Sequence, residues 1–316
     1  MLDYGALIDA LSAALCADIT VAKTATYRIP LPSAGATTLA LTPAWTGDGA
    51  RFIGCRLAAA APGNTARGKR AESSSYMLLS ADTAETLAIM DGEALTLWRA
   101  AATSALAARH LARDDASHLV MIGAGALCPH LVRAYRAVRP IARVTLWSRS
   151  RSRAVATAFA LSAAGIEPTI ADDLQEAVGE ADIVSCATRS PLPLLRGAWL
   201  KKGMHVDLAG SLAPNAREAD DAAIKRARVY VDSRVSAPKA SGDIAAPLKK
   251  KIIGLADIQG DLFELCGGKT KGRKRKDDIT LFKSAGLALG DLVTAMLVWR
   301  ALAAPRHGDK SRAMAG

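Results

Sequence analysis

Long hydrophobic runs, aromatic residues and paired cysteines are all scarce in this sequence of 316 residues, of which 4% are aromatic. No uncharged apolar run approaches the ~18 residues that a transmembrane helix needs, so we expect no membrane partner. The five cysteines include no CxxC pair, which argues against a disulfide framework and a structural zinc site and favours a cytoplasmic protein. The five histidines are scattered, so we expect no metal site.

Charge and apolar content indicate a folded protein with a basic surface. Half of the residues are hydrophobic, which excludes intrinsic disorder, and the length suggests about two domains. Lys and Arg number 41 against 30 Asp and Glu, a net charge of +11. The basic runs 249–251 and 269–276 have no interleaved aromatic residues and no nucleic-acid-binding motif. We therefore interpret them as solvated loops and expect no nucleic-acid partner.

The middle of the chain alternates short apolar strands with helices. Helices are predicted at 126–138 and 153–163. Strands are predicted at 118–122, 143–147, 168–171, 182–187, 205–209 and 229–232. Strands that alternate with helices indicate an α/β fold with a parallel sheet and right-handed crossovers.

The two ends of the chain have a different pattern. Short strands separated by turn residues are predicted at 38–43, 52–58, 75–79 and 87–90, followed by a long helix at 93–112. Residues 284–304 return to helical character, and we expect them to pack onto the N-terminal region. The pattern predicts one domain from 1–112 with 286–304, a second domain at 113–285, and a flexible tail at 305–316.

A glycine-rich turn follows the first strand of the alternating region. Gly123 permits a tight turn, and Gly125 allows the backbone to approach a pyrophosphate at the N-terminus of the next helix. Cys128 replaces the third glycine of the usual GxGxxG pattern and is still a small residue. The position of the turn between a strand and a helix favours a dinucleotide site over an ordinary glycine-rich turn.

The next strand ends without the acidic residue that binds the ribose hydroxyls of NAD. Two hydroxyls and two guanidiniums stand there instead, from Ser148, Arg149, Ser150 and Arg151. A carboxylate would repel a 2′-phosphate, whereas arginine can bind it through charge-assisted hydrogen bonds. The sequence therefore predicts NADPH as the cofactor rather than NADH.

Several separate segments resemble the ornithine cyclodeaminase/mu-crystallin family, and together they cover nearly the whole chain. They are residues 62–64, 95–102, 206–211, 214 with 217–218, 279–286 and the glycine turn. The resemblance implies a homodimer in which a doubly wound Rossmann sheet binds the nicotinamide cofactor. It also implies an α+β substrate-binding and dimerisation domain built from both chain ends.

The resemblance also assigns roles to residues. Arg99 matches the arginine that holds the substrate carboxylate, with Arg56 assisting in catalysis and Arg28 as a further substrate contact. Leu212 and Ala285 align with positions beside the substrate. The implied cofactor contacts are Ala126, Leu127, Thr188, Leu208, Ala209, Gly210 and Ser284. Asp291 is assigned no chemistry.

Two positions depart from the cyclodeaminases. Leu212 stands where these enzymes have the aspartate of the amine chemistry, and Arg56 stands where the family usually has lysine. Leucine cannot transfer a proton, so ornithine cyclisation is disfavoured. The segment resembles instead the branch that reduces cyclic ketimines with NADPH. That branch converts Δ1-pyrroline-2-carboxylate to proline, and often Δ1-piperideine-2-carboxylate to pipecolate, which places the chain in proline metabolism.

Two alternatives remain open. The first is reduction of an open-chain imine made from a 2-oxo acid and an amine, as in an alanine dehydrogenase or an N-alkyl amino acid dehydrogenase. The second is a crystallin-like protein that binds NADPH without catalysis.

Overall fold

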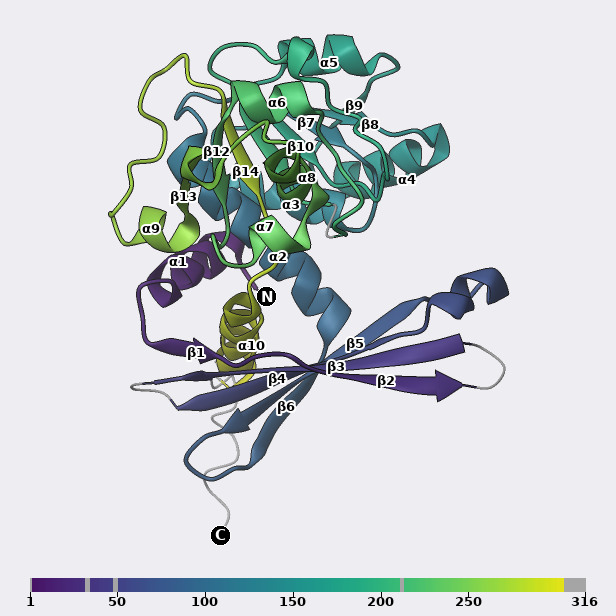
Figure 1. Ribbon diagram of the computed structural model, residues 1–316, viewed down its shortest axis with the longest axis vertical. Coiled ribbons are helices and arrows are strands. Elements are labelled where there is room, and N and C mark those ends of the chain that lie inside the picture. Colours follow the sequence, from purple (N-terminus) through teal and green to yellow (C-terminus); the bar gives the residue numbers. More distant parts are fainter. Residues whose placement is uncertain (1, 32–34, 48–50, 211–212, 304–316) are drawn as a thin grey trace, which may run out of the picture. The chain divides into compact units, whose positions relative to one another are not determined.

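The computed structural model describes residues 2–31, 35–47, 51–210 and 213–303 (Figure 1). The chain divides into two compact units. The smaller unit takes its described residues from 2–3, 18–95 and 291–303, and the larger takes them from 4–17 and 96–290. None of the helices in the described part of the chain combines the length and apolar character that a bilayer crossing requires.

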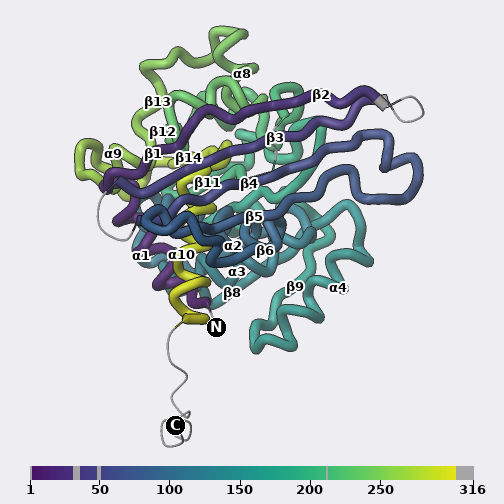
Figure 2. The backbone as a smooth tube through the Cα atoms, turned by 90° about the horizontal axis from the view of Figure 1, so that it is seen from below, coloured from purple at the N-terminus to yellow at the C-terminus, as the bar shows by residue number. Residues whose placement is uncertain are grey.

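The smaller unit contains an antiparallel sheet whose strands lie side by side in Figure 2. The strands are β1 (Ile19–Val21), β2 (Ala25–Leu31), β3 (Gly35–Thr46), β4 (Phe52–Ala60), β5 (Glu72–Ser80) and β6 (Thr86–Asp91). The order is β1-β3-β4-β5-β6, and β2 also pairs with β3. The four predicted strands fall within β3 to β6, whereas β1 and β2 were not predicted. Tyr76, Leu78 and Leu292 form part of the core of this unit.

The larger unit is built on a parallel sheet of eight strands (Figure 1). They are β7 (His118–Ile122), β8 (Arg143–Trp147), β9 (Thr169–Ile170), β10 (Ile183–Cys186), β11 (His205–Leu208), β12 (Arg228–Val231), β13 (Ile258–Asp261) and β14 (Thr280–Lys283). Their order is β13-β12-β14-β11-β10-β7-β8-β9. The predicted doubly wound α/β fold is therefore confirmed. Strands β13 and β14 were not predicted.

The order of the strands reverses next to β7. The chain moves outward from β7 to β8 and β9, and then returns to place β10 on the opposite side of β7. In open parallel sheets, ligands bind outside the carboxyl ends of the strands where the order reverses in this way. The loops that follow β7 and β10 flank this point.

Helices cover both faces of the parallel sheet. The α-helices of the described residues, in both units, are α1 (Tyr4–Ala14), α2 (Gly92–Leu111), α3 (Leu127–Arg136), α4 (Arg151–Ser162), α5 (Leu174–Glu180), α6 (Asp221–Arg226), α7 (Ala237–Ala240), α8 (Gly242–Lys249), α9 (Leu262–Cys266) and α10 (Ala288–Ala303). One face packs Val206 and Leu208 against α5, α6 and α8. Asp207 points to the other face, where its carboxylate accepts a hydrogen bond from Ser104 of α2 at 3.0 Å. This alternation is the expected two-residue period of a strand.

Candidate functional site

The glycine turn after β7 has the geometry that close packing and a bound phosphate require. Gly123 has φ +111°, and a Cβ there would lie 2.5 Å from the carbonyl oxygen of Ala187. Only glycine fits such a position without strain. A Cβ on Gly125 would have no atom within 4 Å, so the backbone there faces open space. Within the described residues, no hydrogen-bond acceptor is found for the backbone N–H groups of Gly125, Ala126 and Leu127.

These three N–H groups lie at the N-terminus of α3, where unpaired donors and the positive end of the helix dipole favour an anion. Cys128, in the first turn of α3, is fully buried and fills the position of the third glycine. Burial raises the pKa of its thiol to about 12, so this cysteine is a packing residue. The turn therefore fits the pyrophosphate of a dinucleotide.

The end of β8 leaves one arginine side chain available to a ligand. The hydroxyl of Ser150 accepts the N–H of Arg153 at 3.4 Å and caps α4, and the N–H of Ser150 donates to the hydroxyl of Ser148 at 3.3 Å. Arg151 forms an ion pair with Asp172. Arg149 is exposed, and its side chain has no ion-pair partner among the described residues.

The loops after β10 and β11 are joined by one buried carboxylate. Thr188 donates its N–H (2.8 Å) and its hydroxyl (2.9 Å) to Oε1 of Glu218, and Gly210 donates its N–H to Oε2 at 2.8 Å. A Cβ on Gly210 would lie 2.2 Å from the nitrogen of Thr188, so glycine is required for the close approach of these loops. Leu208 is fully buried in the core and pairs with Cys186 of β10 and Lys283 of β14, so its side chain is not available to a ligand. Ala209 bonds through its N–H to Cys186.

A second buried carboxylate shapes the loop after β14. One oxygen of Asp232 accepts the N–H groups of Ala285 (2.6 Å) and Gly286 (2.7 Å) and the hydroxyl of Ser284 (3.2 Å). Gly286 has φ +100°, which is incompatible with a right-handed helix. The helix predicted from residue 284 therefore begins only at Ala288.

Arg99 lies on α2 close to this loop and is 8% exposed. A Cβ on Gly290 would lie 2.7 Å from Cγ of Arg99, and a Cβ on Gly286 would lie 3.7 Å from its Nη1. The two glycines therefore give room to the stem and to the guanidinium of Arg99, respectively. A buried guanidinium carries five fixed donors and suits a planar carboxylate.

The other two predicted arginines belong to the smaller unit. Arg56 of β4 donates to the hydroxyl of Ser74 (2.9 Å) and the carbonyl of Gly92 (3.2 Å), and it pairs with Asp291 at 3.4 Å. Asp291 is almost fully buried and is therefore a partner of a predicted site residue, a role that its sequence context did not reveal. Arg28 lies on β2 and is exposed. Leu212 lies outside the described residues.

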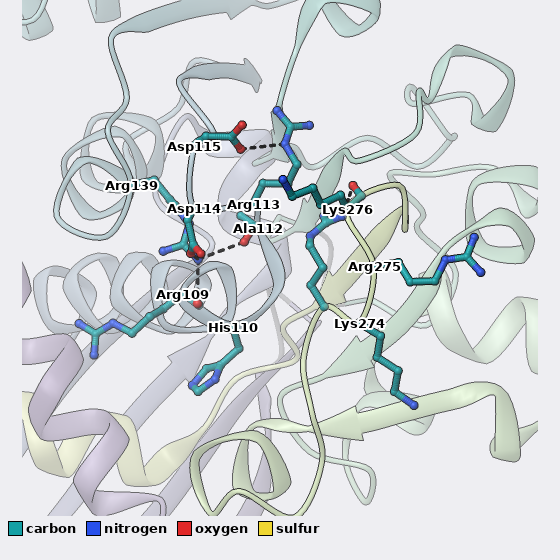
Figure 3. Close-up of a pocket in the computed structure, with 11 residues that line it drawn as sticks. Arg109, His110, Ala112, Arg113, Asp114, Asp115, Arg139, Lys274, Arg275 and Lys276 are labelled. Carbon is teal, nitrogen blue, oxygen red and sulfur yellow. Dashed lines mark hydrogen bonds and ion pairs between the residues drawn. The ribbon is translucent and has the colours of Figure 1, made fainter.

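A basic cavity of about 480 Å³ lies at the opposite edge of the parallel sheet, before β7 and β14 (Figure 3). Its arginines are occupied by the protein itself. Arg139 donates to the carbonyls of Arg109 and Ala112, and Arg273 donates to the carbonyl of Leu111. They satisfy the last carbonyl groups of α2, as cations at a helix C-terminus do. No cluster of three metal-ligating side chains occurs among the described residues.

Comparison with known proteins gives consistent matches. Protein SAR DEFICIENT 4 of Arabidopsis thaliana is 40% identical over 278 residues, which are 86% of this chain and 84% of the relative. Delta(1)-pyrroline-2-carboxylate reductase of Paracoccus denitrificans is 40% identical over 76% of this chain and 77% of its own length. The structure of the Thermococcus litoralis enzyme of that name, in complex with NADH and L-proline, superimposes with a TM-score of 0.84 at 28% identity, covering 95% of this chain and 93% of the other.

The family profile covers almost the whole chain. Residues 5–304 match the ornithine cyclodeaminase/mu-crystallin family, which includes the segments on which the resemblance was based. With the parallel sheet and the glycine turn described above, this match identifies the chain as a member of the ornithine cyclodeaminase/mu-crystallin family.

Proposed function

We propose that this protein is an NADPH-dependent reductase of cyclic 2-imino acids, which converts Δ1-pyrroline-2-carboxylate to proline and Δ1-piperideine-2-carboxylate to pipecolate. At the coarser level, the chain is a nicotinamide-dependent oxidoreductase that acts on a carbon–nitrogen double bond, in line with its named relatives. The observation that carries the proposed substrate class is Arg99, a buried guanidinium in the same unit as the dinucleotide turn.

In this proposal each part of the site has a distinct task. The N–H groups of Gly125, Ala126 and Leu127 hold the pyrophosphate, and Arg99 holds the substrate carboxylate in a fixed orientation. When bound, the cofactor would supply the hydride that forms the new C–H bond at the carbon of an already protonated imine, and the C=N electron pair would become the lone pair of the amine nitrogen. Arg56 is paired with Asp291, and a guanidinium is a poor proton donor or acceptor, so we assign Arg56 to charge stabilisation rather than to proton transfer. We also propose a homodimer, with the interface and substrate contacts in the 1–112 and 286–304 segments.

A substrate panel tests this function. Purified protein is mixed with NADPH and either of the two cyclic imino acids, or with pyruvate plus ammonia or methylamine, and oxidation of the cofactor is followed. We expect oxidation of NADPH with the cyclic substrates. Ornithine, incubated separately with the oxidised cofactor, should give neither proline nor ammonia, because Leu212 cannot carry out the amine chemistry. Turnover with pyruvate and an amine alone would assign an open-chain imine reductase. Tight binding of NADPH without any turnover would assign a non-catalytic binding protein.

Arg149 provides the test of cofactor choice. Its exposed guanidinium follows β8 and has no ion-pair partner among the described residues, so it is available to a 2′-phosphate. We expect Arg149→Ala to weaken NADPH binding by about 10- to 100-fold, since a hydrogen bond to a charged group contributes ~1.5–3 kcal/mol. Binding of NADH, measured by titration calorimetry, should change less than about twofold.

Arg151→Ala is the matched control for this variant. Arg151 is also exposed, but it is already paired with Asp172. We expect its removal to leave the ratio of NADPH to NADH affinity unchanged. A wild-type protein that binds NADH as tightly as NADPH would overturn the proposed preference. The comparison matters because the related Thermococcus litoralis structure contains NADH.

A further inference from the structure

Glu218 occupies an unusual position for a carboxylate. It is fully buried, it lies on neither a strand nor a helix, and both of its oxygens accept hydrogen bonds. Oε1 receives the N–H and the hydroxyl of Thr188, and Oε2 receives the N–H of Gly210. One side chain therefore joins the loop that follows β10 to the loop that follows β11.

The position of Glu218 is itself fixed by its neighbours. Asp243, at the start of α8, accepts the N–H of Glu218 at 2.8 Å and that of Ala219 at 3.1 Å. Lys283, at the end of β14, places its Nζ 3.3 Å from Asp243 Oδ2 and 3.8 Å from Glu218 Oε2. All three side chains are fully buried, so the backbone and the carboxylate of Glu218 are both held in place.

A contribution to stability does not by itself explain why these charged side chains are buried together. Burial, together with the negative charge of Asp243, raises the pKa of the Glu218 carboxyl to about 7. The positive charge of Lys283 and the backbone N–H donors act in the opposite direction and lower this pKa. Buried ionic clusters are often no more stabilising than well-packed apolar side chains of the same volume. The two loops that Glu218 joins lie at the carboxyl edge of the sheet, beside the point between β7 and β10 where the strand order reverses and where ligands bind in sheets of this kind.

We propose that Glu218 is a positioning residue for the nicotinamide half of the dinucleotide, acting through the backbone of Thr188 and Gly210. The inference rests on the proposed function and adds to it a residue that touches neither cofactor nor substrate. The adenine half depends on other elements, namely the turn at Gly123 and the end of β8. Loss of Glu218 therefore affects the two halves of the cofactor differently.

The test compares the whole cofactor with its adenine half. Affinities of the full-length protein for NADPH and for 2′-phospho-ADP, which keeps both phosphates but lacks nicotinamide and its ribose, are measured by calorimetry for wild type and Glu218→Gln. Glutamine keeps the size of the side chain but places a donor against one of the two loops. We expect the Kd for NADPH to rise by about 10- to 100-fold, which corresponds to one lost charge-assisted hydrogen bond. The Kd for the fragment should stay within about twofold, and kcat should fall.

Two further variants make the result decisive. Glu264→Gln is the matched control, since Glu264 also accepts a backbone N–H, that of Asp261, but in the cap of α9; it should leave both affinities unchanged. Thr188→Val removes the hydroxyl bond to Glu218, together with the long 3.4 Å bond that this hydroxyl accepts from the N–H of Ser190, and keeps the backbone bond of Thr188 to Glu218. It should weaken NADPH binding by about two- to tenfold without affecting the fragment. This variant decides the question if Glu218→Gln does not fold.

Three outcomes would overturn the inference. The first is an unchanged NADPH affinity in the folded Glu218→Gln variant, or in Thr188→Val where that variant is the one that folds. The second is an equal loss of affinity for the cofactor and the fragment, which indicates a general structural role. The third is a wild-type protein that binds neither ligand, which refutes the proposed function as well and is thereby distinguished from the first two.

Discussion

Replacing Arg99 by methionine is expected to lower kcat/KM for the cyclic imino acid by about 10²- to 10³-fold, the loss expected for a paired, charge-assisted contact to a carboxylate. Methionine retains an unbranched stem over Gly290, so the packing of α2 against the start of α10 is largely preserved. A rise in KM together with a fall in kcat is expected, because the carboxylate contact both binds the imine and orients it for hydride transfer. Steady-state kinetics with each ring size measure this effect.

The controls separate charge, shape and position. Arg99→Lys retains a positive charge but loses the planar fork, so we expect an intermediate loss of kcat/KM. Arg109→Ala removes another arginine of α2, one that is paired with Asp9 near the surface, and should leave the kinetics unchanged. The Kd for NADPH should be the same in all of these variants. Wild-type kinetics in Arg99→Met would show that this guanidinium does not hold the substrate.

The sequence was most informative where a local pattern determines the structure. Every residue of β7 is buried, and the apolar run 118–122 is followed directly by Gly123. A glycine at that place indicates a tight turn. By contrast, β14 ends in Lys283, and a lysine at a strand end gives no sign that it will be fully buried. Its two carboxylate partners come from residues 218 and 243, and such pairings arise only after the chain has folded.

The same reasoning applies to the candidate site. Arg56 and Asp291 are 235 residues apart in the sequence, so no spacing rule could pair them. The helix predicted from residue 284 failed for a related reason. Alanine and leucine after that position favour a helix, but Asp232 binds the N–H groups of Ala285 and Gly286 and keeps the backbone out of helical geometry. Tertiary hydrogen bonds overrode local propensity there.

The buried carboxylates also explain how the carboxyl edge of the sheet can direct an anion. Glu218 accepts the N–H groups of Thr188 and Gly210, and Asp232 accepts those of Ala285 and Gly286. These donors are therefore unavailable to phosphate. The donors at the N-terminus of α3 follow the glycine turn, where we propose that the pyrophosphate binds.

Replacing either glycine of that turn by alanine is expected to impair a different property, stability for Gly123 and cofactor binding for Gly125. Gly123→Ala forces a side chain to φ +111° and to within 2.5 Å of the oxygen of Ala187. We expect the free energy of unfolding to fall by about 2–4 kcal/mol, because strain and overpacking add. Gly125→Ala meets no atom within 4 Å, so the stability without cofactor should change by less than about 1 kcal/mol.

Binding of the cofactor should reverse that contrast. A pyrophosphate lying on the turn needs the space that the alanine methyl group takes at Gly125, so the Kd for NADPH is expected to rise at least about 100-fold in Gly125→Ala. Denaturant unfolding and calorimetry measure the two effects separately. Gly179→Ala in α5, where a Cβ also meets nothing within 4 Å, is the control and should leave cofactor binding unchanged. If Gly125→Ala binds NADPH as tightly as wild type, the pyrophosphate does not lie on this turn.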